Sequence, residues 1–379
     1  MSLSIQKELT APFQPVAKSD NKVVFADQLR ALAFICVVIV HWLGIYNFQP
    51  DFISMVTGAS PLPADPGILY NSIVPPLPNF NFGPFGVSIF FLISGFVIPF
   101  TMKKKSKLGF ILSRTIRIYP TYIICSFIML AFYIASHLYW GTNSQITVAQ
   151  FFSNVTLTSS ILNYPSIDFI NWTLSIEIKF YLACLLIYSA INKGNPAYLI
   201  LLCMAILAVT FFTKAYKSSV SPGVFSLDGL KIEMMYVIYM MLGVLFNFLY
   251  LNKVRFLSFS FYSIIVSTAF ILTWITGVQA NQFPMVAINY LYGYVLFSTF
   301  FFLRRMFKEL SYIGFLSKIS YSFYALHSVI GYCSIRIVHA LSGSYIAGIT
   351  CAVVVVTLLS YYVNVHIEER SISISKKFR

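Results

Sequence analysis

Residues 84–102 read PFGVSIFFLISGFVIPFTM, and residues 103–107, which follow directly, read KKKSK. A helix needs about 20 predominantly apolar residues to cross the hydrocarbon core of a membrane. The first stretch supplies such a run without a charged side chain. The second is typical of a cytoplasmic border, because lysines gather on that side of membrane-spanning helices. Together the two stretches predict a transmembrane helix and hence an integral membrane protein.

The composition extends this interpretation to the whole chain of 379 residues. Hydrophobic residues make up 58% and charged residues 10%, whereas a soluble domain carries about 25% charged residues. The formal net charge of +14 would suggest a nucleic-acid partner in a soluble protein. Here, however, the basic residues lie in short gaps between apolar runs. We therefore expect membrane lipids, and no nucleic acid, as partners.

Ten apolar runs predict an all-α polytopic fold of about ten transmembrane helices. In chain order they cover 31–48, 84–102, 118–140, 169–191, 196–213, 234–252, 256–276, 284–303, 319–340 and 344–363. We expect a cytoplasmic N-terminal segment over 1–22, one transmembrane domain over 23–366 and a cytoplasmic tail over 367–379. Residues 1–22 lack the apolar run of a cleavable signal peptide, so the first predicted helix is expected to direct insertion.

The distribution of lysine and arginine predicts the orientation. With the N-terminus in the cytoplasm and the helices alternating, 21 of the 26 basic residues lie on the inner side. The three in outer loops are Lys214, Lys217 and Lys231, and Lys179 and Arg336 fall within predicted helices. Because basic residues favour the cytoplasmic side, both termini are predicted to be cytoplasmic.

Ionisable side chains inside transmembrane helices are costly and indicate function. His41 lies roughly 15 Å from the inner edge of a ~30 Å core, at 1.5 Å per helical residue. Glu177 lies roughly 12 Å from the outer edge by the same count. An imidazole and a carboxylate at similar depth suit a general base and its orienting acid. They suit a transporter's proton relay equally well.

Arginines near the predicted inner surface indicate a phosphate site. Arg114 and Arg117 are three residues apart and therefore share one helix face. Arg30, at the inner end of the first predicted helix, is expected on the same side. Guanidinium groups bind phosphate oxygens in a bidentate manner, so the cluster predicts a polyphosphate ligand. Lipid headgroups are the alternative ligand.

Five stretches, in order along the chain, resemble the motifs of the membrane acyltransferase-3 family. Arg30 is followed by His41 eleven residues later, which is similar to the family's Arg-x10-His signature. The other four are GVSIFFLISGF over 86–96, RTIRIYP over 114–120, NWTLSIE over 171–177 and ISYSFYALH over 319–327. The resemblance covers nearly the whole chain and corresponds to the family's stand-alone membrane form.

The resemblance implies an O-acetyltransferase of the bacterial cytoplasmic (inner) membrane. Its members move an acyl group from cytoplasmic acyl-CoA to a hydroxyl group. We expect acetyl-CoA as the donor and, as the acceptor at the outer side, a sugar of a cell-surface polysaccharide, such as the O-antigen of lipopolysaccharide or an exopolysaccharide. Because the thioester supplies the driving force, we expect no metal and no bound cofactor.

The resemblance also implies roles for individual residues. Arg30, Arg114 and Arg117 would hold the CoA phosphates. His41 would act as general base on the acceptor hydroxyl or carry the acyl group covalently, and Glu177 would orient its imidazole or stabilise its cation. The residues expected to line the cavity are Asp27, Ser94, Trp172, Ser175, Tyr324 and His327.

Two alternatives remain open at the level of the sequence. The same mechanism could use another donor, such as succinyl-CoA, or an acceptor other than a polysaccharide. A proton-coupled transporter or flippase would use His41 and Glu177 as a relay and would be indifferent to CoA. The sequence does not indicate the oligomeric state.

Overall fold

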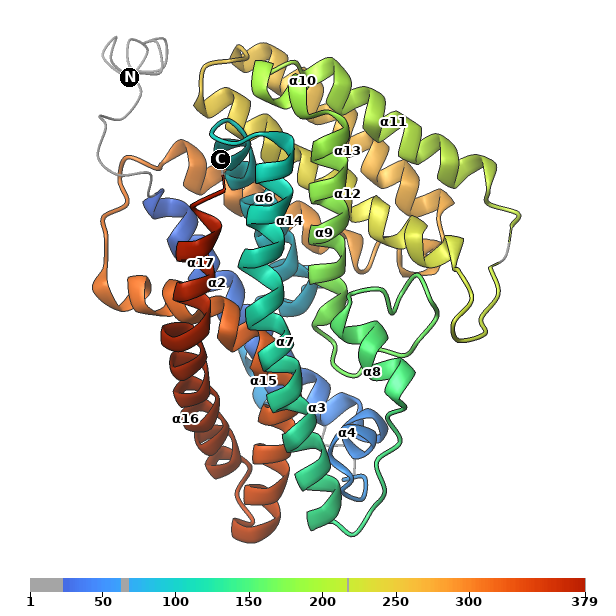
Figure 1. Cartoon of the computed structure of the whole chain (residues 1–379), viewed down its shortest axis with the longest axis vertical. Helices are drawn as coiled ribbons and strands as arrows, with labels where there is room; N and C mark the ends of the chain where they lie inside the picture. Colours follow the sequence, from blue (N-terminus) through green and yellow to red (C-terminus); the bar gives the residue numbers. More distant parts are fainter. Residues whose placement is uncertain (1–22, 63–67, 217, 379) are drawn as a thin grey trace.

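The computed structural model describes residues 23–62, 68–216 and 218–378, and the regular elements in these residues are all helices (Figure 1). The first are α2 (Val24–Ile39), the π-helix η1 (Val40–Ile45), α3 (Tyr46–Phe48), α4 (Pro50–Thr57), α5 (Ile68–Ile73), α6 (Phe82–Met102), α7 (Lys107–Tyr139), α8 (Val148–Val155) and α9 (Asn171–Leu186). They continue as α10 (Tyr188–Lys193), α11 (Pro196–Phe212), α12 (Leu227–Tyr250), α13 (Phe256–Thr276), the 3-10 helix η2 (Ala280–Gln282), α14 (Ala287–Phe302), α15 (Ser311–Ser342), α16 (Tyr345–Val363), the π-helix η3 (Asn364–Glu368) and α17 (Glu369–Ser375). The predicted segment 1–22 and Lys217 lie outside the described residues.

Among the described residues, six helices are long and apolar enough to cross a membrane. They are Val24–Phe48, Phe82–Met102, Lys107–Tyr139, Leu227–Tyr250, Phe256–Thr276 and Tyr345–Ser375. Two shorter apolar helices, Pro196–Phe212 and Ala287–Phe302, coincide with two more of the predicted ranges. The remaining two ranges fall on α9 with α10 and on α15, which contain most of the ionisable residues noted in the sequence.

The helices pack around two hydrophobic cores. α12 lies at the centre of the larger core. Of an apolar stretch of 18 residues within it, 89% is buried, whereas the figure for the helix Tyr345–Ser375 is 28%. Residues of α2, α6, α9, α13 and α14 pack with α12 in that core. The smaller core joins α15 and α16 to parts of α4 and α7. Figure 1 shows α15 and α16 side by side on the flank opposite α11 and α13.

The first helix contains a π-turn in its second half. α2 passes directly into η1 (Val40–Ile45) and then α3, so the helix continues while its faces are rotated. His41 lies within this turn and is 5% exposed. π-turns of this kind occur frequently at functional sites.

Two glycines let the backbones of α6 and α12 touch. A Cβ atom on Gly95 would lie 2.1 Å from the Met240 carbonyl oxygen, and one on Gly243 would lie 2.4 Å from the Leu92 carbonyl oxygen. Small residues permit close helix contact in this way inside membranes. Ser94, the neighbour of Gly95, lines the cavity described below.

The basic turn after α6 is tied to the C-terminal helix. The Ser106 side chain accepts a hydrogen bond from the Gly109 N–H (3.1 Å) and so caps α7. Lys105 donates its Nζ to the Ser375 carbonyl (3.0 Å). Burial lowers the pKa of Lys105, and the positive charge of Arg114 lowers it further.

The segment predicted as a cytoplasmic tail from residue 367 is helical and packs against α7. η3 continues α16 without a break, and α17 continues η3 to Ser375. Glu368 is buried there, with 6% of its surface exposed. The C-terminal residues therefore form part of the bundle, because a π-turn, rather than a loop, follows the last apolar run.

The contact of α6 with α12 makes a prediction for stability. Gly95→Ala and Gly243→Ala should each lower the free energy of unfolding by about 1–3 kcal/mol, the usual cost of overpacking. Gly314→Ala is the matched control, because a Cβ atom there meets nothing within 4 Å. Thermal unfolding of the three detergent-purified variants measures the effect. Unchanged midpoints for Gly95→Ala and Gly243→Ala would contradict the close approach.

Candidate active site

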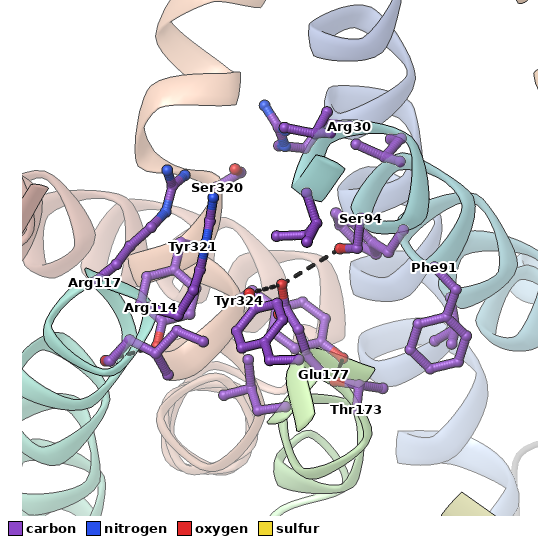
Figure 2. Close-up of a pocket in the computed structure, with 18 of the residues that line it drawn as sticks. Arg30, Phe91, Ser94, Arg114, Arg117, Thr173, Glu177, Ser320, Tyr321 and Tyr324 are labelled. Carbon is purple, nitrogen blue, oxygen red and sulfur yellow. Dashed lines mark hydrogen bonds between the residues drawn. The ribbon is translucent and has the colours of Figure 1, made fainter. Parts of the chain in front are cut away.

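One cavity brings together side chains from α2, α6, α7, α9, α15 and η3 (Figure 2). Its empty volume, counted with the open mouth, is about 1120 Å³. Its polar lining consists of Arg30, Ser94, Arg114, Arg117, Thr173, Glu177, Tyr181, Ser317, Ser320, Tyr321, Tyr324 and Glu368. The cavity thus contains all three arginines and the Glu177 carboxylate that the sequence singled out.

Arg30 is held in place from its own helix. Its Nη1 lies 2.7 Å from Asp27 Oδ1 and 3.4 Å from Ser317 Oγ. Ser317 Oγ also donates to Asp27 Oδ1 at 3.3 Å. Asp27 is not part of the lining, in contrast to the prediction, and instead fixes Arg30 from behind. Arg30 itself lines the cavity.

Arg114 is buried, whereas Arg117, almost one turn further along α7, is exposed. The Arg114 guanidinium donates to Thr101 Oγ1 and lies over the Tyr181 ring, 5.7 Å from its centroid. Within the part of the chain that the structure describes, its Nε has no hydrogen-bond partner. In Figure 2, Arg114 and Arg117 lie on one side of the cavity and Arg30 on the other. An anion in the cavity would therefore face guanidinium groups from two sides.

Glu177 contacts Ser94 and Tyr181, whereas the sequence analysis paired it with His41. Its Oε1 accepts hydrogen bonds from Ser94 Oγ (3.4 Å) and from the Tyr181 hydroxyl. No hydrogen bond between described residues joins it to His41. Counting residues along a helix estimates depth but not which helices are neighbours. α15, rather than α9, packs against α2 and η1 around His41.

A second carboxylate in the cavity escaped the sequence analysis. Glu368 Oε2 accepts hydrogen bonds from Ser322 Oγ (2.6 Å) and Asn364 Nδ2 (3.0 Å). Asn364 and Glu368 are four residues apart, which places them on one helix face. Continuing the last helix beyond residue 363 would have revealed this pair. The neighbouring Glu369 forms an exposed ion pair with Lys318 instead.

His41 does not line the cavity. Its Nδ1 lies 3.0 Å from the Tyr332 hydroxyl, and its ring centroid lies 4.8 Å from that of His327. The His327 ring in turn lies 5.6 Å from the Tyr324 ring, which does line the cavity. Two ring contacts therefore separate the cavity from His41, with His327 behind Tyr324 rather than in the lining.

Of the other residues predicted to line the cavity, Ser94 and Tyr324 do so and Trp172 and Ser175 do not. Trp172 packs its ring against Phe91 (6.3 Å) and Tyr236 (5.5 Å). It belongs to the border of the larger core. Thr173, its neighbour, lines the cavity instead.

Ser175 belongs to a buried ion-pair network on the other side of α9. Lys179 Nζ lies 2.9 Å from Glu233 Oε2 and 2.5 Å from Ser175 Oγ. Ser160 donates to Glu233 Oε1 at 2.6 Å. Glu233 was missed because the predicted helix began one residue later. Ser226, whose side chain caps α12 at the Gly229 N–H, is the signal for the earlier start.

The charges of the cavity suit an anionic ligand. Its lining carries three arginines and two glutamates, so its formal charge is positive. Throughout residues 23–62, 68–216 and 218–378, no three His, Cys, Asp or Glu side chains gather in a way that could hold a metal ion. The arrangement can bind phosphate groups at its arginines and a slender apolar chain among Phe90, Phe91 and Val97.

A comparison with known protein families gives one result. The family model described as an acyltransferase domain matches residues 23–365 of the chain. That match includes the three arginines, Glu177 and His41. No curated protein and no solved structure matches the chain.

The Lys179–Glu233 pair predicts an asymmetry between single and double substitution. Lys179→Met should lower the free energy of unfolding by about 3–5 kcal/mol, because it leaves a buried carboxylate unpaired. Lys179→Met with Glu233→Leu should recover much of this loss. Lys193→Met, at an exposed lysine, is the control, and thermal unfolding is the measurement. A double variant as unstable as the single one would show that the pair is not coupled.

Proposed function

The chain belongs to the membrane acyltransferase-3 family, and from this premise we propose that it is a membrane O-acetyltransferase. In this proposal it transfers the acetyl group of acetyl-CoA to a sugar hydroxyl of a cell-surface polysaccharide. The observation that carries the proposal is that Arg30, Arg114 and Arg117 line one and the same cavity. Acetyl-CoA is the donor substrate, and the chemistry needs no other cofactor.

The cavity supports CoA as the donor in two ways. CoA carries a pyrophosphate and a 3′-phosphate, and guanidinium forks bind such groups in a bidentate manner. The pantetheine arm is slender, and its methylene and methyl groups can lie against the apolar lining formed by Phe90, Val97 and Ile98. Glu177 holds the Tyr181 hydroxyl, and the Tyr181 ring supports Arg114. In this proposal Glu177 therefore helps to position the Arg114 guanidinium, through the side chain of Tyr181.

We further propose ten transmembrane helices, with both termini and the arginines on the cytoplasmic side. The distribution of basic residues supports this orientation. Figure 1 shows the start of α2 and the C-terminal α17 toward the same end of the bundle, as an even number of crossings requires. Arg117 and the basic turn at Lys105 belong to elements at that end. Acyl-CoA would then enter from the compartment that contains it, the bacterial cytoplasm.

The reaction proposed at His41 is a direct transfer. The acceptor oxygen attacks the thioester carbonyl while the His41 imidazole takes the hydroxyl proton. The C–O bond forms, the C–S bond breaks and CoA leaves as a thiolate. The thiolate then receives the proton, which returns His41 to its neutral form. Burial of His41 in the π-turn of η1 supports this role, because it excludes competing water.

Donor binding makes the first prediction of this proposal. The double substitution Arg114→Ala with Arg117→Ala should raise the Kd for acetyl-CoA by about 100-fold or more, because hydrogen bonds to charged groups contribute about 1.5–3 kcal/mol each. Arg117→Ala alone, at an exposed position, should raise the Kd by about tenfold. Isothermal titration of detergent-purified protein measures both.

Arg255→Ala, an exposed arginine that does not line the cavity, is the matched control and should bind acetyl-CoA normally. Titration with acetyl-dephospho-CoA tests whether the 3′-phosphate contributes. An unchanged Kd in the double variant would refute a phosphate site at these arginines. Proton-coupled flux without CoA binding would favour a transporter instead.

Transfer makes the second prediction. His41→Ala should lower the rate of acetylation by about 100-fold or more, as is typical for the loss of a general base. Its Kd for acetyl-CoA should stay unchanged, because His41 does not line the cavity. Mass spectrometry of envelope polysaccharide, from cells with and without the protein, measures the product. Succinyl groups or a modified non-polysaccharide acceptor would identify a different donor or acceptor.

A further inference from the structure

His327 carries a buried nitrogen atom without a partner, beside the proposed catalytic base. The side chain is 0% exposed. Its Nδ1 lies 2.8 Å from the carbonyl oxygen of Tyr324, and its Nε2 has no hydrogen-bond partner among the described residues. A buried polar atom left unpaired costs about 1–3 kcal/mol. Such an atom therefore needs a functional explanation.

The contact with Tyr324 determines which nitrogen of His327 carries the proton. A carbonyl oxygen can only accept, so the Nδ1 atom of His327 must be the donor. A neutral imidazole has one N–H group. Nε2 of the neutral ring therefore presents a lone pair, and this lone pair is the unpartnered site.

The ring of His327 lies next to His41. Its centroid lies 4.8 Å from that of His41, with 56° between the two planes. The Trp42 indole donates to the His327 carbonyl oxygen at 2.9 Å, and the Phe323 ring stacks on the imidazole. His41 also contacts the Tyr332 hydroxyl through Nδ1 (3.0 Å). His327 is thus the second imidazole beside the base, and its ring is held by the Nδ1 contact with Tyr324 and by the Phe323 ring.

We propose that His327 is a positioning residue for His41, in the role that the sequence analysis gave to Glu177. This inference rests on the proposed acetyl transfer. When His41 takes the proton of the acceptor hydroxyl, it becomes an imidazolium with two N–H groups, and one of them donates to the Nε2 lone pair of His327. The imidazolium of His41 is stabilised until the proton passes to the CoA thiolate. No other reactant is needed, and His327 itself gains and loses nothing.

A neutral hydrogen-bond acceptor suits the buried position next to His41 better than a carboxylate does. An unpaired carboxylate buried beside a neutral imidazole would be strongly disfavoured between turnovers. A neutral imidazole avoids that cost and still accepts a hydrogen bond from the cation. Two adjacent imidazoles also resist double protonation, because like charges at this distance repel. The pair therefore holds at most one extra proton, and hence one positive charge, and must release that proton before the next turnover.

Two substitutions of His327 separate this role from simple packing. His327→Asn keeps an N–H donor near Nδ1 for the Tyr324 carbonyl but has no atom at the Nε2 position. His327→Gln places an amide oxygen near Nε2, where it can accept a hydrogen bond. The proposal expects kcat to fall by about 100-fold in His327→Asn and by about tenfold or less in His327→Gln. The Kd for acetyl-CoA should stay unchanged in both.

A purely structural role predicts the reverse order, because Asn alone keeps the bond to Tyr324. Equal or higher kcat for His327→Asn than for His327→Gln, at matched thermal stability, would overturn the proposal. If His327→Asn does not accumulate, His327→Leu replaces it, and a kcat equal to that of His327→Gln would again overturn it. Normal transfer by His41→Ala would refute the proposed function itself. Loss of transfer in His41→Ala with full activity in His327→Asn would refute this inference alone.

Discussion

A charge inside a membrane bundle must have a partner, since removing an ion from water costs several kcal/mol. This constraint determines where the ionisable groups of the chain lie. Lys179 and Glu233, at 12% and 3% side-chain exposure, pair with each other at 2.9 Å. The arginines of the cavity have Glu177 and Glu368 in the same lining. The positive charge that remains there faces open space, so a bound anion would complete the pairing.

Much of the fold could be predicted because transmembrane helices are encoded locally. Each apolar run identifies its own helix, and the ten predicted ranges all fall on helices of the structure. Six of them are long and apolar enough to cross a membrane. The helix ends were less accurate. α12 begins at Leu227, seven residues before its predicted start, because its first turns carry Asp228, Lys231 and Glu233.

The site could be predicted only where one helix carries the information. Arg114 and Arg117 share a face because they are three residues apart, and both line the cavity. The partners of Glu177, His41 and Glu368 depend on which helices are neighbours, and a single sequence does not contain that information. The π-turns in η1 and η3 add to the difficulty, since each rotates the face that follows it. Both turns contain or adjoin a residue of the site.

Tyr324 separates the arginine-lined cavity from the pair of histidines, and for the proposed reaction this arrangement has a mechanistic consequence. Its ring faces the cavity, its hydroxyl hydrogen-bonds Thr173 Oγ1 at 2.8 Å, and its carbonyl fixes the tautomer of His327. For the proposed transfer, the thioester must pass this ring to reach His41. One neutral hydrogen bond contributes only about 1 kcal/mol, so binding of the CoA phosphates at the arginines can offset the displacement. Binding energy from the non-reacting end of the donor would then open the way to the base. That coupling would explain why the strongest binding groups lie away from the atoms that react.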